Sequence, residues 1–200
     1  TGSTPHSSVS SVRLHIFGAS GSGTTTLGAA LAAAQGWLHL DADDFYWKQG
    51  VLPFSEKVPQ PERVSQLLRA MQGHGDWIIS GGSLYSWAGP VVPMFTHAVF
   101  LRLDDSLRMQ RIHARERSRF GDALDTDAER KRISSAFFEW AAGYETGGDR
   151  LRSLQRHQQW AAELHCPVLQ LDTAQPLNAL VGAVQRFCKN DSYWRLLYKR

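Results

Sequence analysis

The sequence predicts an α/β protein in which a five-stranded parallel sheet is covered by helices on both faces. Two observations lead to this prediction. Short apolar runs alternate with segments of helical periodicity along the 200 residues, and strands buried on both faces of a parallel sheet have such nearly continuous apolar sequences. In addition, a glycine-rich segment at 18–25 connects the first apolar run to the first helical segment.

The predicted elements follow one another without an internal repeat. We expect strands at 12–17, 37–40, 77–80, 98–103 and 168–171. We expect helices at 26–34, 61–72 and 177–187, one helix capped by Asp104 or Asp105, and two more from apolar stripes within 133–144 and 151–164. The helix at 61–72 has the clearest pattern, because its apolar residues recur at helical spacing after Pro61.

Length and composition fit one domain, residues 11–200, after a short tail. With 42% hydrophobic residues, the chain can form a core of its own. Residues 1–10 are mostly small and polar, and we expect a disordered tail or a cloning remnant there.

The composition also bears on partners and location. The net charge of +3 is too small to indicate a nucleic-acid partner. No apolar run approaches the ~20 residues of a membrane span, and no signal peptide is visible. Cys166 and Cys188 lie far apart, which indicates buried thiols in a reducing compartment. We therefore expect a cytoplasmic monomer or homodimer that binds neither membrane nor nucleic acid.

The segment 18–25, called the glycine loop below, predicts a phosphate-binding site. Its glycines permit positive φ and a close approach of phosphate oxygens, and the following helix contributes free N–H groups. In this context the loop indicates a P-loop NTPase fold, a three-layer sandwich with strand order 2-3-1-4-5, although a plain glycine turn is the alternative. The predicted nucleotide-binding residues are Gly18, Ala19, Ser20, Gly21, Ser22, Gly23, Thr24, Thr25 and Thr26.

One position of the glycine loop departs from the usual pattern. Thr24 stands where a P-loop has a lysine, whose charge bridges the β- and γ-phosphates of a nucleotide. Loss of that charge costs on the order of 10²-fold in rate unless another cation replaces it. The next residue, Thr25, has the hydroxyl that such loops use to ligate Mg²⁺.

A basic helix can supply the missing charge. Arg111, Arg115 and Arg119 recur every fourth residue and so line one helical face, which Arg108 can join. The alternative is a solvated basic face. We expect a lid-type region at about 108–152, with Arg111, Arg115 and Arg119 as catalytic residues. The returning arm of this lid offers Arg150 or Arg152.

Three acids follow the second predicted strand, at the same sheet edge as the glycine loop. Asp41, Asp43 and Asp44 include the carboxylates that phosphoryl transfer needs to accept a proton or hold Mg²⁺, although each could instead cap a helix. The predicted acceptor-binding residues are Asp41, Asp44, Tyr46 and Gly82, the last from the loop 80–83 after the third strand.

These motifs together resemble kinases. The run Asp43-Asp44-Phe45-Tyr46 resembles uridine and nicotinamide riboside kinases, and Asp41-Ala42-Asp43 resembles the D-x-D segment of shikimate-kinase-type enzymes. Both resemblances imply that Asp43 is the catalytic base or a ligand of the acceptor and that Asp41 lies nearer the metal, with Thr25. The spacing of Arg111 and Arg115 is similar to the start of the adenylate kinase lid. The first 120 residues thus resemble a bacterial subgroup of adenylate-kinase-related kinases and ATPases.

The expected function is phosphoryl transfer from ATP, or another nucleoside triphosphate, with Mg²⁺ to a small hydroxyl or phosphate acceptor such as a nucleoside or nucleotide. Because of Thr24, a nucleotide-binding regulatory module without transfer activity is an alternative. A sulfotransferase-like enzyme is a further one, since residues 22–25 resemble its S-G-T-T segment, but Gly21 stands where those enzymes have a lysine.

Overall fold

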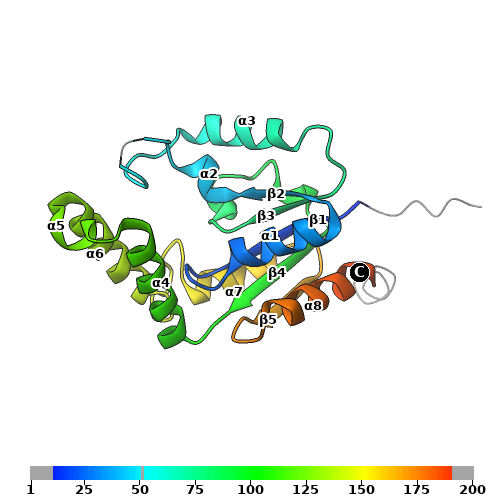
Figure 1. Ribbon diagram of the computed structural model, residues 1–200. Helices are drawn as coiled ribbons and strands as arrows, with labels where there is room; N and C mark the ends of the chain where they lie inside the picture. Colours follow the sequence, from blue (N-terminus) through cyan, green and yellow to red (C-terminus); the bar gives the residue numbers. More distant parts are fainter. Residues whose placement is uncertain (1–10, 51, 191–200) are drawn as a thin grey trace, which may run out of the picture.

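The computed structural model describes residues 11–50 and 52–190, so the predicted tail at 1–10 lies outside the described residues. Its centre is a parallel sheet with the strand order β2-β3-β1-β4-β5 (Figure 1), which confirms the predicted topology. The strands are β1 (Arg13–Gly18), β2 (Leu38–Asp41), β3 (Trp77–Ser80), β4 (His97–Arg102) and β5 (Val168–Asp172). Each differs from its predicted range by at most one residue at either end.

Helices connect these strands. They are α1 (Thr24–Gln35), α2 (Ala42–Tyr46), α3 (Gln60–Met71), α4 (Asp105–Phe120), α5 (Ala123–Thr126), α6 (Ala128–Ala142), α7 (Leu154–Glu163) and α8 (Leu177–Lys189), with short 3₁₀ turns η1 (Leu84–Ser86) and η2 (Val92–Met94). Helix α1 begins two residues earlier than predicted, because Gly23 adopts a φ of 95° and serves as its N-cap. Among the described residues, no helix has both the length and the apolar character to cross a bilayer.

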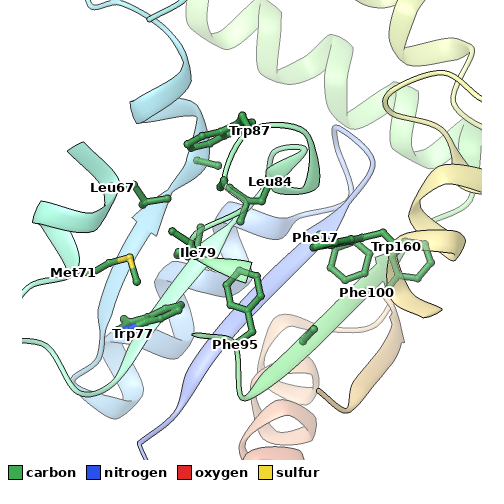
Figure 2. Close-up of a cluster of buried hydrophobic side chains, with 14 residues drawn as sticks. Phe17, Leu67, Met71, Trp77, Ile79, Leu84, Trp87, Phe95, Phe100 and Trp160 are labelled. Carbon is green, nitrogen blue, oxygen red and sulfur yellow. The ribbon is translucent and has the colours of Figure 1, made fainter. Parts of the chain in front are cut away.

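The sheet lies between two helical layers, and each interface has its own apolar core. On one face, Leu67 and Met71 of α3 and Trp160 of α7 belong to a cluster with side chains from the strands (Figure 2). On the other face, α1 and α8 bury Leu27 and Val184 in a second cluster. Successive strand residues alternate between these clusters, as the pleat of a strand requires, and the sheet is covered on both sides as predicted.

Helix α4 begins after one of the two caps that its sequence predicts. Asp104 caps it, since the Asp104 carboxylate accepts hydrogen bonds from the backbone N–H of Ser106 and Leu107 at 3.0 and 3.2 Å. Gly121, with a φ of 50°, ends it. Helices α4 and α6 then pack together at one end of the sheet (Figure 1).

The cysteines differ in burial. Cys188 of α8 lies in the core, whereas Cys166 is half-buried. Desolvation raises the pKa of the Cys166 thiol to about 11, so this thiol stays protonated at neutral pH.

Two histidines are buried in the core, one in β1 and the other in α7. His15 of β1 stacks on Phe17 and Phe95, and its Nδ1–H donates to the carbonyl of Ile79 at 3.2 Å. His157 of α7 is also fully buried. Desolvation lowers the pKa of His15 to about 4 and that of His157 to about 3. Both rings are therefore neutral in the folded protein at neutral pH.

This burial predicts acid sensitivity. The unfolded chain takes up protons at an ordinary histidine pKa of about 6.5, while the folded chain does so only near pH 4 and below. The free energy of unfolding should therefore fall as the pH drops from about 6.5 towards 4, and should show no histidine contribution above that window. Urea unfolding at several pH values measures this dependence, and His15→Gln should make it shallower. Parallel pH profiles for the two proteins would contradict the assignment.

Candidate functional site

The glycine loop connects β1 to α1 at the carboxyl edge of the sheet. Two of its glycines are required by close contacts: a Cβ at Gly18 would lie 2.6 Å from the carbonyl of Leu101, and one at Gly21 would lie 2.9 Å from that of Arg108. No side chain caps the N-terminus of α1, and its first turn has no acidic residue. The free N–H groups of this turn can therefore bind an anion.

The remaining loop residues differ in exposure. Ala19 and Ser22 are buried, Ser20 and Thr24 are half-buried, and Thr25 and Thr26 are exposed. Thr24 faces the loop after β3, because a Cβ at Gly81 would lie 3.6 Å from its hydroxyl.

A hydrogen bond joins the glycine loop to the acidic segment. The Thr25 hydroxyl donates to Oδ2 of Asp41 at 2.6 Å. The other carboxylate oxygen of Asp41 accepts from the backbone N–H of Asp43 at 2.9 Å and caps α2. Two hard oxygen donors thus lie together beside the free N–H groups of α1. This donor set suits Mg²⁺, which binds proteins through a few oxygens and keeps phosphate oxygens or waters as its other ligands.

Asp43 and Asp44 occupy the first turn of α2. The Asp43 side chain reaches solvent, but enough protein surrounds it that desolvation raises its pKa, against the opposing influence of Arg152 and Arg115. Desolvation and the neighbouring Asp41 also raise the pKa of Asp44, while His39 opposes this shift. A carboxyl with a raised pKa is better suited to accept a proton near neutral pH.

The three predicted arginines of α4 point to different places. Arg115 is half-buried and interacts electrostatically with Asp43 and Asp41. The guanidinium of Arg111 instead donates to the backbone carbonyl of Thr173 at 2.9 Å. Arg119 lies 3.8 Å from Glu116 and over the ring of Phe54. Of the three, the structure therefore brings Arg115 to the acids and directs the other two elsewhere.

Arg108 has a structural position that the sequence pattern did not indicate. Its side chain is only 1% exposed and lies under the glycine loop, where it donates to the carbonyls of Ser20 and Ala141 at 3.2 and 2.8 Å. It also pairs with Asp105. Arg108 therefore connects the glycine loop to α4 and α6 rather than joining the exposed arginine face.

Arg152, from the segment between α6 and α7, reaches the site from the opposite direction. Its Nε donates to the Ser83 hydroxyl at 3.1 Å, and its Nη1 lies 3.5 Å from the Ser20 hydroxyl. The guanidinium also lies 5.2 Å from the centre of the Trp140 ring. Arg150, the other arginine of the predicted returning arm, is exposed.

The predicted acceptor side includes Tyr46 and Gly82. The Tyr46 ring is half-buried and packs against the guanidinium of Arg63, 4.0 Å from the ring centre. Gly82 has a φ of 72°, and a Cβ there would lie 2.8 Å from that of Ala42. Gly82 thus allows the loop after β3 to pack tightly against the start of α2. Sequence reasoning did not identify Arg63, whose burial depends on its hydrogen bond to the Val58 carbonyl.

A cavity of about 580 Å³ also opens beside the carboxyl ends of β4 and β5. Its lining contains one arginine and four carboxylates: Arg102, Asp104, Asp105, Glu145 and Asp172. This excess of negative charge would repel a phosphate, so the cavity does not replace the glycine loop as a candidate phosphate site.

Comparisons with known proteins identify a relative by sequence and solved structures with a similar fold. No protein-family model matches the chain. YqaC, an uncharacterized protein of Bacillus subtilis (strain 168), is 36% identical over 171 residues, which cover 86% of this chain and 94% of YqaC. A gluconokinase from Sinorhizobium meliloti 1021 matches in structure with a TM-score of 0.51 at 17% identity, over 92% of this chain and 98% of the kinase. A shikimate kinase from Bacteroides thetaiotaomicron matches with a TM-score of 0.50 at 15% identity, over 89% of this chain and 98% of that kinase. The two structural likenesses show that the chain shares its α/β fold with these two kinases.

Proposed function

The chain belongs to the same protein family as YqaC of Bacillus subtilis, and we propose that it transfers the γ-phosphoryl group of a nucleoside triphosphate to a small acceptor. The acceptor is a hydroxyl or phosphate compound of the size of a nucleoside or nucleotide. One observation carries this proposal: the Asp43 carboxyl lies within electrostatic reach of Arg152, which contacts the glycine loop, and of Asp41, which is bonded to Thr25. A candidate base, a cation and a metal-binding pair are thus grouped around one phosphate-binding loop.

In this proposal the glycine loop binds ATP, or another nucleoside triphosphate, through its backbone N–H groups. Thr25 and Asp41 would hold Mg²⁺, which neutralises charge on the phosphates when bound. Arg115 faces the acids from α4 and adds positive charge on the acceptor side. Asp44, Tyr46 and Gly82 remain the predicted contacts of the acceptor.

In the proposed transfer step, Asp43 accepts the proton of the acceptor hydroxyl. The acceptor oxygen forms a bond to the γ-phosphorus as the bond between that phosphorus and the β–γ bridging oxygen breaks. The electron pair of the broken bond stays with the departing diphosphate, and the proton of the acceptor hydroxyl passes to the Asp43 carboxylate. The products are the diphosphate and the phosphorylated acceptor.

Thr24 favours a second candidate function. A loop with a neutral hydroxyl in place of lysine can still bind phosphate through backbone N–H groups but stabilises the transferring group less. A module that binds a nucleotide and transfers nothing would retain the loop without the cation. Both functions predict nucleotide binding, so only a measurement of turnover distinguishes them.

A screen for product formation tests the proposal. The purified protein is incubated with MgATP and panels of nucleosides, nucleotides and small alcohols, and ADP release is followed for each acceptor. Release that depends on one acceptor class and is lost in Asp43→Asn supports transfer. Nucleotide-dependent melting without acceptor-dependent release would instead support the binding module.

Thr25→Ala provides a direct check of the metal-binding pair. This change removes one of the two hard oxygen donors, so we expect the affinity for MgATP to fall by about tenfold, roughly the loss of one contact to a charged group. Calorimetric titration measures the affinity, and Thr25→Ser, which keeps the hydroxyl, should bind like the unmodified protein. Equal affinities for the alanine and serine variants would show that the hydroxyl is not used.

A further inference from the structure

We propose that Arg152 supplies the positive charge that the glycine loop lacks at Thr24, by contacting the γ-phosphate of the bound nucleotide. This inference rests on the proposed function and names the residue that binds the γ-phosphate in it. The arginines of α4 were the expected source of this charge, and Arg152 was one of two arginines offered by the returning arm of the predicted lid. The inference therefore moves the role from α4 to that arm.

The glycine loop itself has no charge to offer. Residues 18–26 contain only glycine, alanine, serine and threonine. The side chain of Thr24 is half-buried and faces Gly81. A triphosphate bound here would carry several negative charges beside a loop that offers only neutral donors, which leaves a cation from elsewhere as a requirement for tight binding.

Within residues 11–50 and 52–190, two arginines hydrogen-bond to the loop, and both do so at Ser20. Arg108 binds the Ser20 carbonyl from beneath, but it is buried and already bonded to Asp105 and Ala141. Arg152 approaches the Ser20 hydroxyl and is half-buried. Only the second therefore has a guanidinium with donors available to a ligand on the exposed side of the loop.

Neighbouring side chains hold Arg152 in place. The Ser83 hydroxyl accepts from its Nε, and the Trp140 ring packs against its guanidinium. These contacts leave Nη1 of the guanidinium 3.5 Å from the Ser20 hydroxyl of the loop. Groups of the protein itself thus hold the guanidinium, which lowers the ordering cost of binding a nucleotide.

The position of Arg152 also relates it to the reacting groups. It interacts electrostatically with Asp43 while contacting Ser20, so it lies between the candidate base and the phosphate-binding loop. Arg115 interacts with the same acid from α4, but no contact joins it to the glycine loop among the described residues. Arg152 is therefore the arginine that can contact the loop-bound phosphates, while Arg115 faces the acceptor side.

Calorimetric titration of MgATP and MgADP into single and double variants tests this role. We expect Arg152→Ala to lower the affinity for MgATP by about 10- to 100-fold, as for loss of a charge-assisted contact, and to affect MgADP less because ADP lacks the γ-phosphate. Thr24→Lys should restore most of the MgATP affinity in the Arg152→Ala background and add little to the unmodified protein. Arg150→Ala, which removes an exposed arginine two positions away, should bind both nucleotides normally.

The outcomes separate this inference from the proposed function. If the unmodified protein binds MgATP and Arg152→Ala retains the same preference for MgATP over MgADP, Arg152 has no such role, although the proposed function stands. If the unmodified protein binds neither nucleotide, both fail. Arg152→Lys keeps a cation on a shorter reach and should bind MgATP better than Arg152→Ala, and thermal melting confirms that each variant is folded. Additive effects of Thr24→Lys and Arg152→Ala would also overturn the compensation.

Discussion

Replacement of Asp43 by asparagine is expected to lower the rate of phosphoryl transfer by about 10²- to 10⁴-fold, the usual contribution of a general base, while the affinity for MgATP stays within a few-fold. The amide keeps the size of the side chain but cannot accept the proton of the acceptor. Asp43 is suited to this role because desolvation raises its pKa, while Arg152 and Arg115 keep its carboxylate accessible near neutral pH.

The measurement is ADP release with the acceptor identified by screening, together with a separate titration of MgATP. Asp44→Asn is the comparison variant, since Asp44 is the next residue of the same helical turn. Because Asp44 is a predicted contact of the acceptor, its loss should weaken acceptor binding and leave the proton-accepting group in place. If Asp44→Asn is the more damaging of the two, the base is Asp44. If Asp43→Asn loses nucleotide binding in parallel with the rate, the residue acts in binding rather than in transfer.

Replacement of Arg108 by methionine should destabilise the fold more than any other change discussed above. Methionine fills much of the same volume, but the carbonyls of Ser20 and Ala141 lose their donor beneath the glycine loop. Loss of these buried charge-assisted contacts should lower the free energy of unfolding by about 3 kcal/mol. For a chain of this size, that corresponds to a melting temperature lower by about 6–12 °C.

Arg117→Met serves as the control in the same helix. Arg117 is exposed and pairs with Asp125 on the surface, so its loss should change the melting temperature little. Calorimetric or spectroscopic melting compares the two variants. Similar melting temperatures for both would mean that Arg108 does not anchor the glycine loop.

Local sequence determined the strands, the longer helices and the phosphate-binding loop, whereas the short helices α2 and α5 were not predicted. Apolar runs predicted all five strands, because strands buried on both faces have no polar side to interrupt them. The cap at Asp104 followed from side-chain chemistry within a few residues. The glycine loop and the acids after β2 could be placed together from topology alone, since the carboxyl ends of parallel strands share one edge.

The sequence could not decide which arginines serve the site. A four-residue step along a helix rotates the side chain by about 40°, so residues eight apart differ by about 80° and long side chains diverge. Arg111 consequently reaches Thr173 and Arg119 reaches Phe54, while Arg115 between them faces the acids. The periodicity placed all three on one face but could not determine their separate partners.

The contact between Arg152 and Ser20 spans 132 residues of sequence. The sequence offered Arg152 as one of two arginines of the returning arm but did not indicate this contact, because the contact depends on how the α6–α7 connection folds back onto the carboxyl edge of the sheet. The burial of Arg108 beneath the same loop is likewise set by the packing of α4 and α6. Local propensity and strand order therefore followed from the sequence, whereas the source of positive charge at the glycine loop was decided by tertiary packing, since it brings together side chains that no local rule relates.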